Sequence, residues 1–331
     1  MDSVSLHEDS LPLERQAKIY KQRFGVAFTS STFSNWIIKA SKLRLEPLIE
    51  RLNEIQMQSD YIHGDETTLQ VLKEKDKKPQ NKSYIWLKAS NDTHPIVLIH
   101  YSANRASTTA KAIFKGFNGY LQTDGYPGYN DIAKQEGVIQ LGCWAHARRK
   151  FADILKSTVS DQQSKQLAKE VIDYIAQLYK VEKQIKDKPP SEKLIIREKE
   201  SKPIIRNIKN WLDKNFFIAQ KIDGAIAKAF IYLNNQFTKL SVYLTNGKLA
   251  IDNNKAENHI RPIALGRKNW LFTTSTDGAN ALANWYSIIE TAKANDIDPY
   301  KYLCYILKEL PIYQQANMNI DPLLPWNVSL V

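Results

Sequence analysis

The periodicity of apolar residues changes twice along this chain, and these changes constrain the fold more than any other feature. Between residues 60 and 141, short β-rich runs alternate with polar linkers, whereas both flanking regions have helical spacing. The predicted order begins with three strands (61–72, 83–89 and 95–101) and a helix (105–114). A strand (120–123), a short helical crossover (128–134) and a last strand (138–141) follow.

This order, β-β-β-α-β-α-β, predicts an α/β protein with a ribonuclease H-like fold, in which helices flank a mixed five-stranded sheet. The last strand–helix–strand unit implies parallel neighbours, so both strands should end at one edge of the sheet. Residues 145–245 are highly charged and show helical periodicity around residues 172–179, 204–212 and 226–240. They predict a large all-helical insertion, interrupted at Pro189-Pro190, with residues 186–202 as a solvated stretch.

The N-terminal region, residues 12–58, also has helical spacing. Gly25 is expected to close one helix, and Thr29, Ser30 or Ser31 to cap the next. This outline fits a helix-turn-helix or, equally, a helical hairpin packed on the main domain. The predicted organisation starts with an N-terminal helical segment (1–58) and a first part of the core (59–156). The helical insertion (157–250), a second part of the core (251–310) and a C-terminal tail (311–331) follow.

The charge balance indicates a polyanionic partner. The net charge is +11 and the isoelectric point about 9.3, in a chain with an ordinary 43% of hydrophobic residues. No run of about 18 apolar residues and no secretory signal are present, which argues against a membrane span. The two cysteines, Cys143 and Cys304, lie far apart and predict neither a zinc ribbon nor a disulfide. A reducing cytoplasm is the expected location.

Three acidic residues are the candidates for chemistry. Asp65 and Asp124 lie in or at the end of strand-like runs, and Glu257 lies in a helix-like stretch. Convergent carboxylates in a basic protein suit divalent cations, which take hard oxygen ligands and can bridge to phosphate. Each acid alone could instead be a capping or turn residue. Glu66 should face away from Asp65, because neighbouring side chains of a strand point to opposite faces.

Together, seven motifs carry a family resemblance: the chain resembles the transposases of the bacterial insertion-sequence-66 family. The motifs are Gly-Asp-Glu-Thr at 64–67, Gly-Tyr-Leu-Gln-Thr-Asp-Gly-Tyr at 119–126, Gly-Cys-Trp-Ala-His-Ala-Arg-Arg-Lys-Phe at 142–151, Asp-Asn-Asn-Lys-Ala-Glu at 252–257, Ile-Arg-Pro-Ile-Ala-Leu-Gly-Arg-Lys-Asn-Trp-Leu-Phe at 260–272, Asp-Pro-Tyr-Lys-Tyr-Leu at 298–303 and Leu-Leu-Pro-Trp-Asn at 323–327. Each motif is weak alone, but seven in order are specific.

The resemblance implies a transposase that cleaves and transfers DNA strands with an Asp-Asp-Glu triad, which maps onto Asp65, Asp124 and Glu257. Such phosphoryl transfer uses two divalent ions, here Mg²⁺ or Mn²⁺, and we expect Asp65 to bridge both while Asp124 and Glu257 each hold one. The implied partners are insertion-sequence ends and target DNA, bound by a homo-oligomer. If Glu257 fails this assignment, Glu290 is the next acid to consider.

Basic residues near Glu257 are candidates for DNA contact. Arg261 lies one helical turn after Glu257 and could orient that carboxylate or hold a phosphate, although an ordinary helix ion pair is the alternative. Pro262 is expected to end this helix. Arg267 and Lys268 would then lie in a turn before a strand-like segment at 270–272, where they suit phosphate contact.

Further DNA contacts are predicted around the strand at 138–141. His146 should lie beside the metals; Cys143 and His146 have zinc-like spacing, but two ligands do not make a site. Arg148 and Arg149 lie in the helix that follows. Arg105, at the start of helix 105–114, is a weaker candidate.

The family pattern usually includes an upstream, cysteine-rich, zinc-binding region. This chain has no cysteine before Cys143, so the resemblance implies a truncated or split reading frame, with an upstream partner frame as a further partner. Two alternatives therefore remain beside the transposase: a DNA-binding remnant without transposition activity, and a ribonuclease H-like nuclease.

Overall fold

The computed structural model describes residues 6–7 and 11–330. The described chain divides into two compact units. The sheet unit comprises the described residues of Met1–Gly119, Pro127–Val138 and Lys255–Val331, and the helical unit comprises Tyr120–Tyr126 and Ile139–Asn254. The second unit therefore includes most of the strands at 119–122 and 138–141 as well as the helices predicted as an insertion.

The N-terminal helices of the sheet unit are α2 (Leu13–Phe24), α3 (Ser30–Ala40) and α4 (Glu46–Gln56), with one π-helical turn at Ser41–Leu45. Gly25 ends α2 with a left-handed φ of 68°, and the Thr29 hydroxyl caps α3 by accepting the amide hydrogen of Thr32 at 3.1 Å. The predicted helices and both predicted caps are confirmed.

Three long antiparallel strands form the centre of the sheet unit: β1 (Tyr61–Lys73), β2 (Lys82–Ser90) and β3 (Val97–Ser102). A short strand, β6 (Thr273–Ser275), pairs with β1 in parallel and directly follows the strand-like segment expected at 270–272. The sheet is therefore mixed, and the described chain contains six strands rather than five. The α/β class is confirmed.

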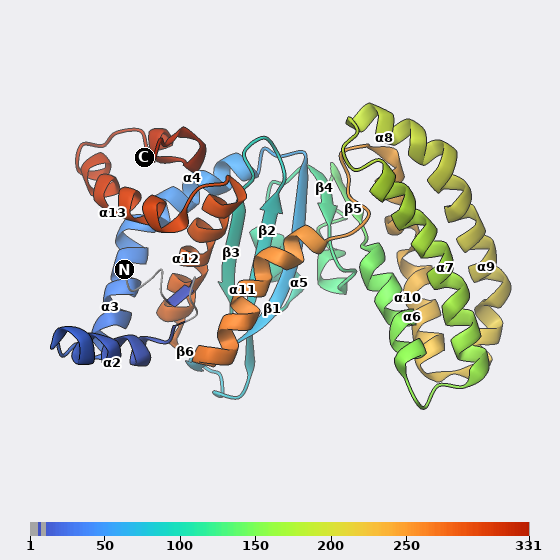
Figure 1. The fold of residues 1–331 in the computed structure, drawn as a ribbon, viewed down its shortest axis with the longest axis horizontal. Coiled ribbons are helices and arrows are strands. Elements are labelled where there is room, and N and C mark those ends of the chain that lie inside the picture. The colour runs from blue at the N-terminus through green and yellow to red at the C-terminus, as the bar shows by residue number, and fades with distance from the viewer. Residues whose placement is uncertain (1–5, 8–10, 331) are drawn as a thin grey trace. The chain divides into compact units, whose positions relative to one another are not determined.

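Helices α11 (Asn254–Trp270) and α12 (Thr276–Ala294) cover this sheet (Figure 1). One core joins apolar residues of the three strands with Ala256, Ile260 and Ile263 of α11 and Tyr286 of α12. Along the edge of β3, the hydroxyls of Ser287 and Thr291 accept from the backbone amides of Ile99 and Val97 at 2.8 and 3.0 Å. Helix α12 thereby satisfies a strand edge that would otherwise be open to pairing.

The opposite face of the sheet meets the short helix α5 (Ser107–Ile113), a 3₁₀ turn at Pro127–Tyr129, and α4. A second core joins α4 and α12 to α13 (Pro299–Gln315) and to the 3₁₀ turn Asp321–Leu323 near the C-terminus. The crossover predicted as a helix at residues 128–134 is only the 3₁₀ turn followed by hydrogen-bonded turns. Its Gly and Asn residues favour turns over a helix.

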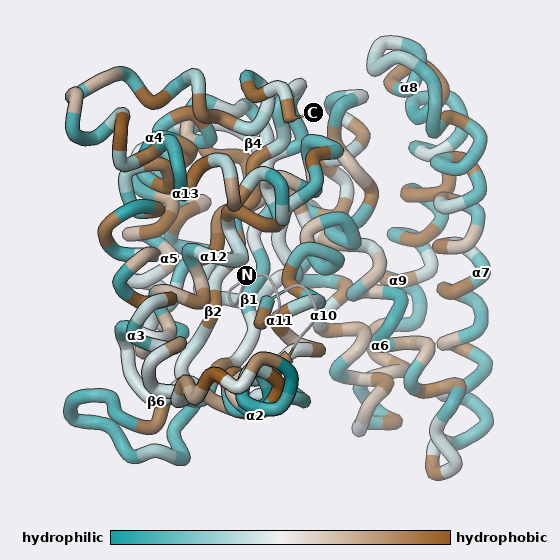
Figure 2. Tube along the Cα trace, turned by 60° about the vertical axis from the view of Figure 1, so that its left-hand side comes forward, coloured by the Kyte–Doolittle hydropathy of each residue, from teal (hydrophilic) through white to brown (hydrophobic). Residues whose placement is uncertain are grey.

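The helical unit contains all but the first residue of β4 (Gly119–Gln122) and of β5 (Val138–Leu141). Its helices are α6 (Trp144–Lys156), α7 (Gln162–Gln184), α8 (Pro190–Ile196), α9 (Lys202–Ile222) and α10 (Gly224–Ser241). No strand occurs within residues 144–245, all of which are described. Apolar faces of α6, α7, α9 and α10 pack together, and Figure 2 shows hydrophobic and hydrophilic residues alternating along α7.

Apart from Arg197 and Ser201, residues 186–202 are exposed or half-exposed, so the expectation that this stretch is solvated is confirmed for most of these residues. They form α8 and a π-helical turn, and Arg197 within them is only 2% exposed. Its guanidinium donates to both carboxylate oxygens of Glu182 at 2.8 and 2.6 Å and to three backbone carbonyls, those of Tyr243, Asn246 and Leu249. Nothing in the charged sequence around Arg197 distinguishes it from its exposed neighbours, because its partners lie 15 to 52 residues away.

Two expectations about the region after Glu257 are wrong. Pro262 lies inside α11 and does not end it, and Arg267 and Lys268 belong to the last turn of that helix. The packing of Ile260 and Ile263 into the core keeps the helix continuous although Pro262 lacks an amide hydrogen. The strand begins at Thr273 and not at Trp270.

No helix among residues 6–7 and 11–330 is both long enough and apolar enough to cross a membrane.

Buried Lys88 should make stability depend on pH. Its side chain is 1% exposed, and burial lowers its pKa to about 7. The unfolded chain therefore binds more protons than the folded chain between pH 7 and about pH 10, so the free energy of unfolding should rise with pH in this window. In Lys88→Met the titrating group is absent. Urea unfolding at pH 7 and pH 10 measures the free energy of unfolding of both proteins. The wild type should gain stability relative to the variant as the pH rises, whereas an equal difference at both pH values would contradict the role of Lys88.

Replacing Arg197 should destabilise the helical unit. Arg197→Met leaves Glu182 as a largely buried charge without its partner, a loss of about 3–5 kcal/mol for a broken buried pair. Lys199→Met, two residues away on an exposed side chain, is the matched control and should cost less than about 0.5 kcal/mol. Urea unfolding followed by circular dichroism measures both, and equal stabilities of the two variants would contradict the role of Arg197.

Candidate active site

Asp65 lies in the middle of β1, and the register of the sheet determines which way it faces. It is paired with Leu87 of β2, and its side chain points to the same face of the sheet as those of Leu69 and Val71. All three apolar residues belong to the core under α11 and α12. Asp65 therefore faces the side of the sheet that α11 covers. Its carboxylate is half-buried, and its Oδ1 accepts the amide hydrogen of Glu66 at 2.9 Å.

Glu66 faces the other side of the sheet, as predicted. Its side chain is 2% exposed, and its Oε2 accepts the hydroxyl of Tyr129 at 2.5 Å. The guanidinium of Arg105, which precedes α5, donates to Oε1, with Nε at 2.8 Å. Glu66 is thus held in an internal ion pair. Arg105 contributes its charge to that pair, which competes with the phosphate contact expected of it.

Glu257 lies in the first turn of α11, where the helix dipole favours an acidic side chain. It directly follows Ala256 and precedes Ile260 by three residues, and both apolar residues pack on the sheet. Glu257 therefore flanks the packed side of the helix and is half-buried. Arg261, one turn later, is exposed. Within the sheet unit, Asp65 and Glu257 belong to elements joined by one core.

Arg267 connects the end of α11 to β1. Its Nη1 donates to the hydroxyl of Thr68 at 2.8 Å and also to the Thr68 backbone carbonyl. Burial lowers the pKa of this guanidinium. These bonds tie α11 to the strand that carries Asp65, so Arg267 has a structural role that its sequence context did not indicate. Lys268 beside it is exposed.

Asp124 follows β4 in the helical unit. The Thr123 amide donates to the Leu141 carbonyl at 3.1 Å, and the Gly119 amide donates to the Gly137 carbonyl at 3.0 Å. Both bonds advance in the same direction along β4 and β5, so the two strands are parallel, as predicted. Asp124 is half-buried, and its Oδ1 accepts the Tyr126 amide hydrogen at 2.8 Å.

Buried Gln122 joins three segments next to Asp124. Its amide nitrogen donates to the carbonyls of Gly142, after β5, and Ala250, in the segment that leads into α11, at 3.0 and 3.1 Å. The Asn253 amide donates to the sulfur of buried Cys143 at 3.3 Å. These contacts were not predicted, since a glutamine within a strand has no sequence signature of its partners.

Cys143 occupies the N-cap position of α6, and His146 lies in the first turn of this helix. The Cys143 sulfur and a ring nitrogen of His146 lie within 4.8 Å of each other. The Nε2 of His146 is 3.4 Å from Nη1 of Arg149. Arg148 and Arg149 are exposed on α6. The helical unit thus places Asp124, His146 and both arginines after two parallel strands, where the carboxyl ends of such strands form binding sites.

Glu290, the alternative third acid, has internal partners. It is 4% exposed on α12 and pairs with Nδ1 of His259 at 3.0 Å and with Nζ of Lys293 at 3.2 Å. Half-buried Glu257 is therefore the better candidate for a cation ligand. Asp65, Asp124 and Glu257 offer hard oxygen donors, the type that Mg²⁺ and Mn²⁺ take.

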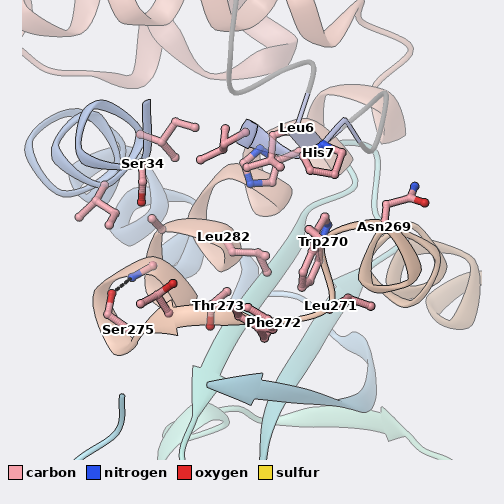
Figure 3. Close-up of a pocket in the computed structure, with 17 residues that line it drawn as sticks. Leu6, His7, Ser34, Asn269, Trp270, Leu271, Phe272, Thr273, Ser275 and Leu282 are labelled. Atoms are coloured by element: carbon pink, nitrogen blue, oxygen red, sulfur yellow. Dashed lines mark hydrogen bonds between the residues drawn. The ribbon is translucent and has the colours of Figure 1, made fainter. Parts of the chain in front are cut away.

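A cavity of about 350 Å³ lies elsewhere in the sheet unit. Figure 3 shows Trp270, Phe272 and Leu282 beside it, with His7 opposite. Its lining is mainly apolar, and none of the acidic or basic candidates named above lines it. It is therefore not part of the carboxylate site.

Comparison with known proteins gives a consistent result. The family model described as "Transposase IS66 family" matches residues 3–281, and "IS66 C-terminal element" matches residues 287–326. The uncharacterized proteins y4jD and y4qI of Sinorhizobium fredii are each 31% identical to this chain, over 96% and 98% of its length. These alignments cover 63% and 61% of the two relatives, so the chain spans about three fifths of the relatives it matches.

Proposed function

Since the chain belongs to the IS66 family of transposases, we propose that it catalyses metal-dependent cleavage and transfer of DNA strands at the ends of an insertion sequence. The observation that carries the proposal is the family match across nearly the whole chain, together with half-buried Asp65, Asp124 and Glu257 within its motifs. The partners would be insertion-sequence ends and target DNA, bound by a homo-oligomer.

We further propose that Asp65, Asp124 and Glu257 together hold two Mg²⁺ or Mn²⁺ ions on a ribonuclease H-like fold. Three antiparallel strands followed by a parallel pair support this fold. Divalent ions held by carboxylates would activate the attacking oxygen and stabilise charge on the phosphate and the leaving oxygen. Water would be the attacking group in cleavage, and a DNA 3′-hydroxyl in strand transfer.

Exposed cations would position the DNA. Arg148 and Arg149 on α6 and Lys268 and Arg261 on α11 are exposed, so their charges are accessible to phosphate. His146, in the first turn of α6 and with Nε2 3.4 Å from Nη1 of Arg149, would hydrogen-bond the scissile phosphate. Arg267 would act chiefly by holding α11 against β1 through Thr68.

Charge-removing substitutions test the triad. Asp65→Asn, Asp124→Asn and Glu257→Gln each keep the side-chain size but remove the charge that holds a cation. Each should lower Mg²⁺- or Mn²⁺-dependent cleavage by at least about a hundredfold, because such ions supply several kcal/mol. DNA affinity should change little. The assay is strand cleavage and transfer with DNA that carries the ends of the element.

Matched controls for the triad are Asp131→Asn and Glu136→Gln, which change acids that are not in the motifs and should leave the rate unchanged. Asp131 pairs with Lys134 near the surface, and Glu136 is exposed. If wild-type protein cleaves and a triad variant cleaves equally well, that acid is not a ligand. A chain that binds DNA but shows no metal-dependent cleavage would instead be the binding remnant.

Salt dependence tests the DNA contacts. Arg148→Ala, Arg149→Ala and Lys268→Ala should each weaken binding to all sequences alike and reduce the slope of log affinity against log salt by about one per lost phosphate contact. Lys209→Ala, which removes a half-exposed lysine paired with Asp213 on α9, is the control. Titrations at two or more salt concentrations give the slopes, and slopes equal to that of the wild type would remove the residue from the interface.

A further inference from the structure

Helix α10 of the helical unit presents two side chains to the turn that carries Asp124. Tyr232 and Gln236 lie four residues apart, on one face of α10. The Tyr232 hydroxyl donates to the backbone carbonyl of Asp124 at 2.6 Å. This bond links residues 108 positions apart in the sequence. All the groups involved belong to the helical unit.

The contact is close enough to require a glycine. Gly125 has φ of +91°, a region that residues with a Cβ rarely adopt. A Cβ at this position would lie 3.0 Å from both the Tyr232 hydroxyl and the Gln236 Cδ. The turn after Asp124 is therefore shaped to the surface of α10.

Backbone and side chain of Asp124 are both restrained. The Tyr232 bond fixes the peptide plane that follows Asp124, and the Tyr126 amide hydrogen binds Oδ1 of the carboxylate at 2.8 Å. Rotation of that peptide plane would move the chain leading to Tyr126 and disturb the second bond. The Tyr232 hydroxyl on α10 therefore influences the orientation of the Asp124 carboxylate.

Tyr232 remains a proton donor under ordinary conditions. Burial raises its pKa, and the nearby Cys143 and Asp124 raise it further. The Nζ of Lys150, on α6, lies 4.7 Å from the centre of the Tyr232 ring, which fixes the ring from another helix. The hydroxyl is therefore held in place as well as protonated.

We propose that Tyr232 is a positioning residue for Asp124: its hydroxyl sets the turn so that the Asp124 carboxylate is oriented for a divalent cation. The inference rests on the proposed function and extends it, because it gives the helical region between Asp124 and Glu257 a part in positioning an active-site carboxylate. Tyr232 itself does not contact the reacting atoms.

The test is Tyr232→Phe, which removes the hydroxyl but keeps the ring and its contact with Lys150. A lost neutral hydrogen bond corresponds to a change of about 3- to 10-fold. The Mg²⁺ and Mn²⁺ concentrations that half-saturate cleavage should rise by this factor, with DNA affinity unchanged. In the metal-free protein, the amide hydrogen of Tyr126 should exchange with solvent faster by a similar factor, a readout that does not depend on activity.

The control is Tyr174→Phe, the same change at a half-buried tyrosine on α7 of the same unit, which should alter neither readout. The inference is overturned if Tyr232→Phe leaves both the metal dependence and the Tyr126 exchange as in the wild type, or if it lowers the rate without changing either. Either result counts against the inference only when Asp124→Asn is inactive in the same assay, because this shows that Asp124 takes part in cleavage. If Asp124→Asn is as active as the wild type, it is the proposed function that fails.

Discussion

The helical unit depends on a hydrogen-bonded junction at the point where the chain enters and leaves it. Gln122 donates to carbonyls of Gly142 and Ala250, and the amides of Trp144 and Asn253 donate to Ile251 and Cys143. The start and end of an excursion of more than 100 residues are therefore bonded to each other. Closing so long a loop costs little more entropy than closing a shorter one, but the direction of the returning chain must be set by contacts.

This junction matters for the site because two motifs adjoin it. Asp124 lies two residues after Gln122, and α11 begins at Asn254, one residue after Asn253. The Asp252 carboxylate accepts the Tyr179 hydroxyl at 2.9 Å and the Asn254 amide hydrogen at 3.1 Å, which anchors the start of α11 to α7. The motif that ends in Glu257 thus begins with residues whose task is structural.

Strand alternation separates two adjacent acids into different roles. Asp65 faces the core beneath α11, whereas Glu66 pairs with Arg105 and Tyr129 on the opposite face. Sequence reasoning predicted this separation, because alternation along a strand is a local property. The strands β1 to β3 were predicted almost to the residue for the same reason. The burial of Arg197, the position of Pro262 inside α11 and the start of β6 were not predicted correctly, because partners distant in sequence decide them.

The site shows the same division. The three acids and the basic candidates are found from motifs, whereas Tyr232 has only the helical spacing of an apolar stripe, and its hydroxyl partner is a backbone carbonyl in another segment. Arg267 was identified as basic, but its bonds to Thr68 could not be inferred. Side-chain bonds to backbone carbonyls impose no requirement on the identity of the partner residue, so they leave no pattern in a single sequence.

Arg197 illustrates why such bonds can still demand one residue type. Its five donor hydrogens match five bonds: two to Glu182 and three to the carbonyls of Tyr243, Asn246 and Leu249. Those carbonyls lie in the segment that leads back to the junction at 250–253. Lysine has three donors and no planar fork, so it would leave buried carbonyls or the Glu182 carboxylate unsatisfied. The path of the chain between Tyr243 and Leu249, which leads toward Glu257, therefore depends on the guanidinium of Arg197. The charged sequence around Arg197 gives no sign of this role.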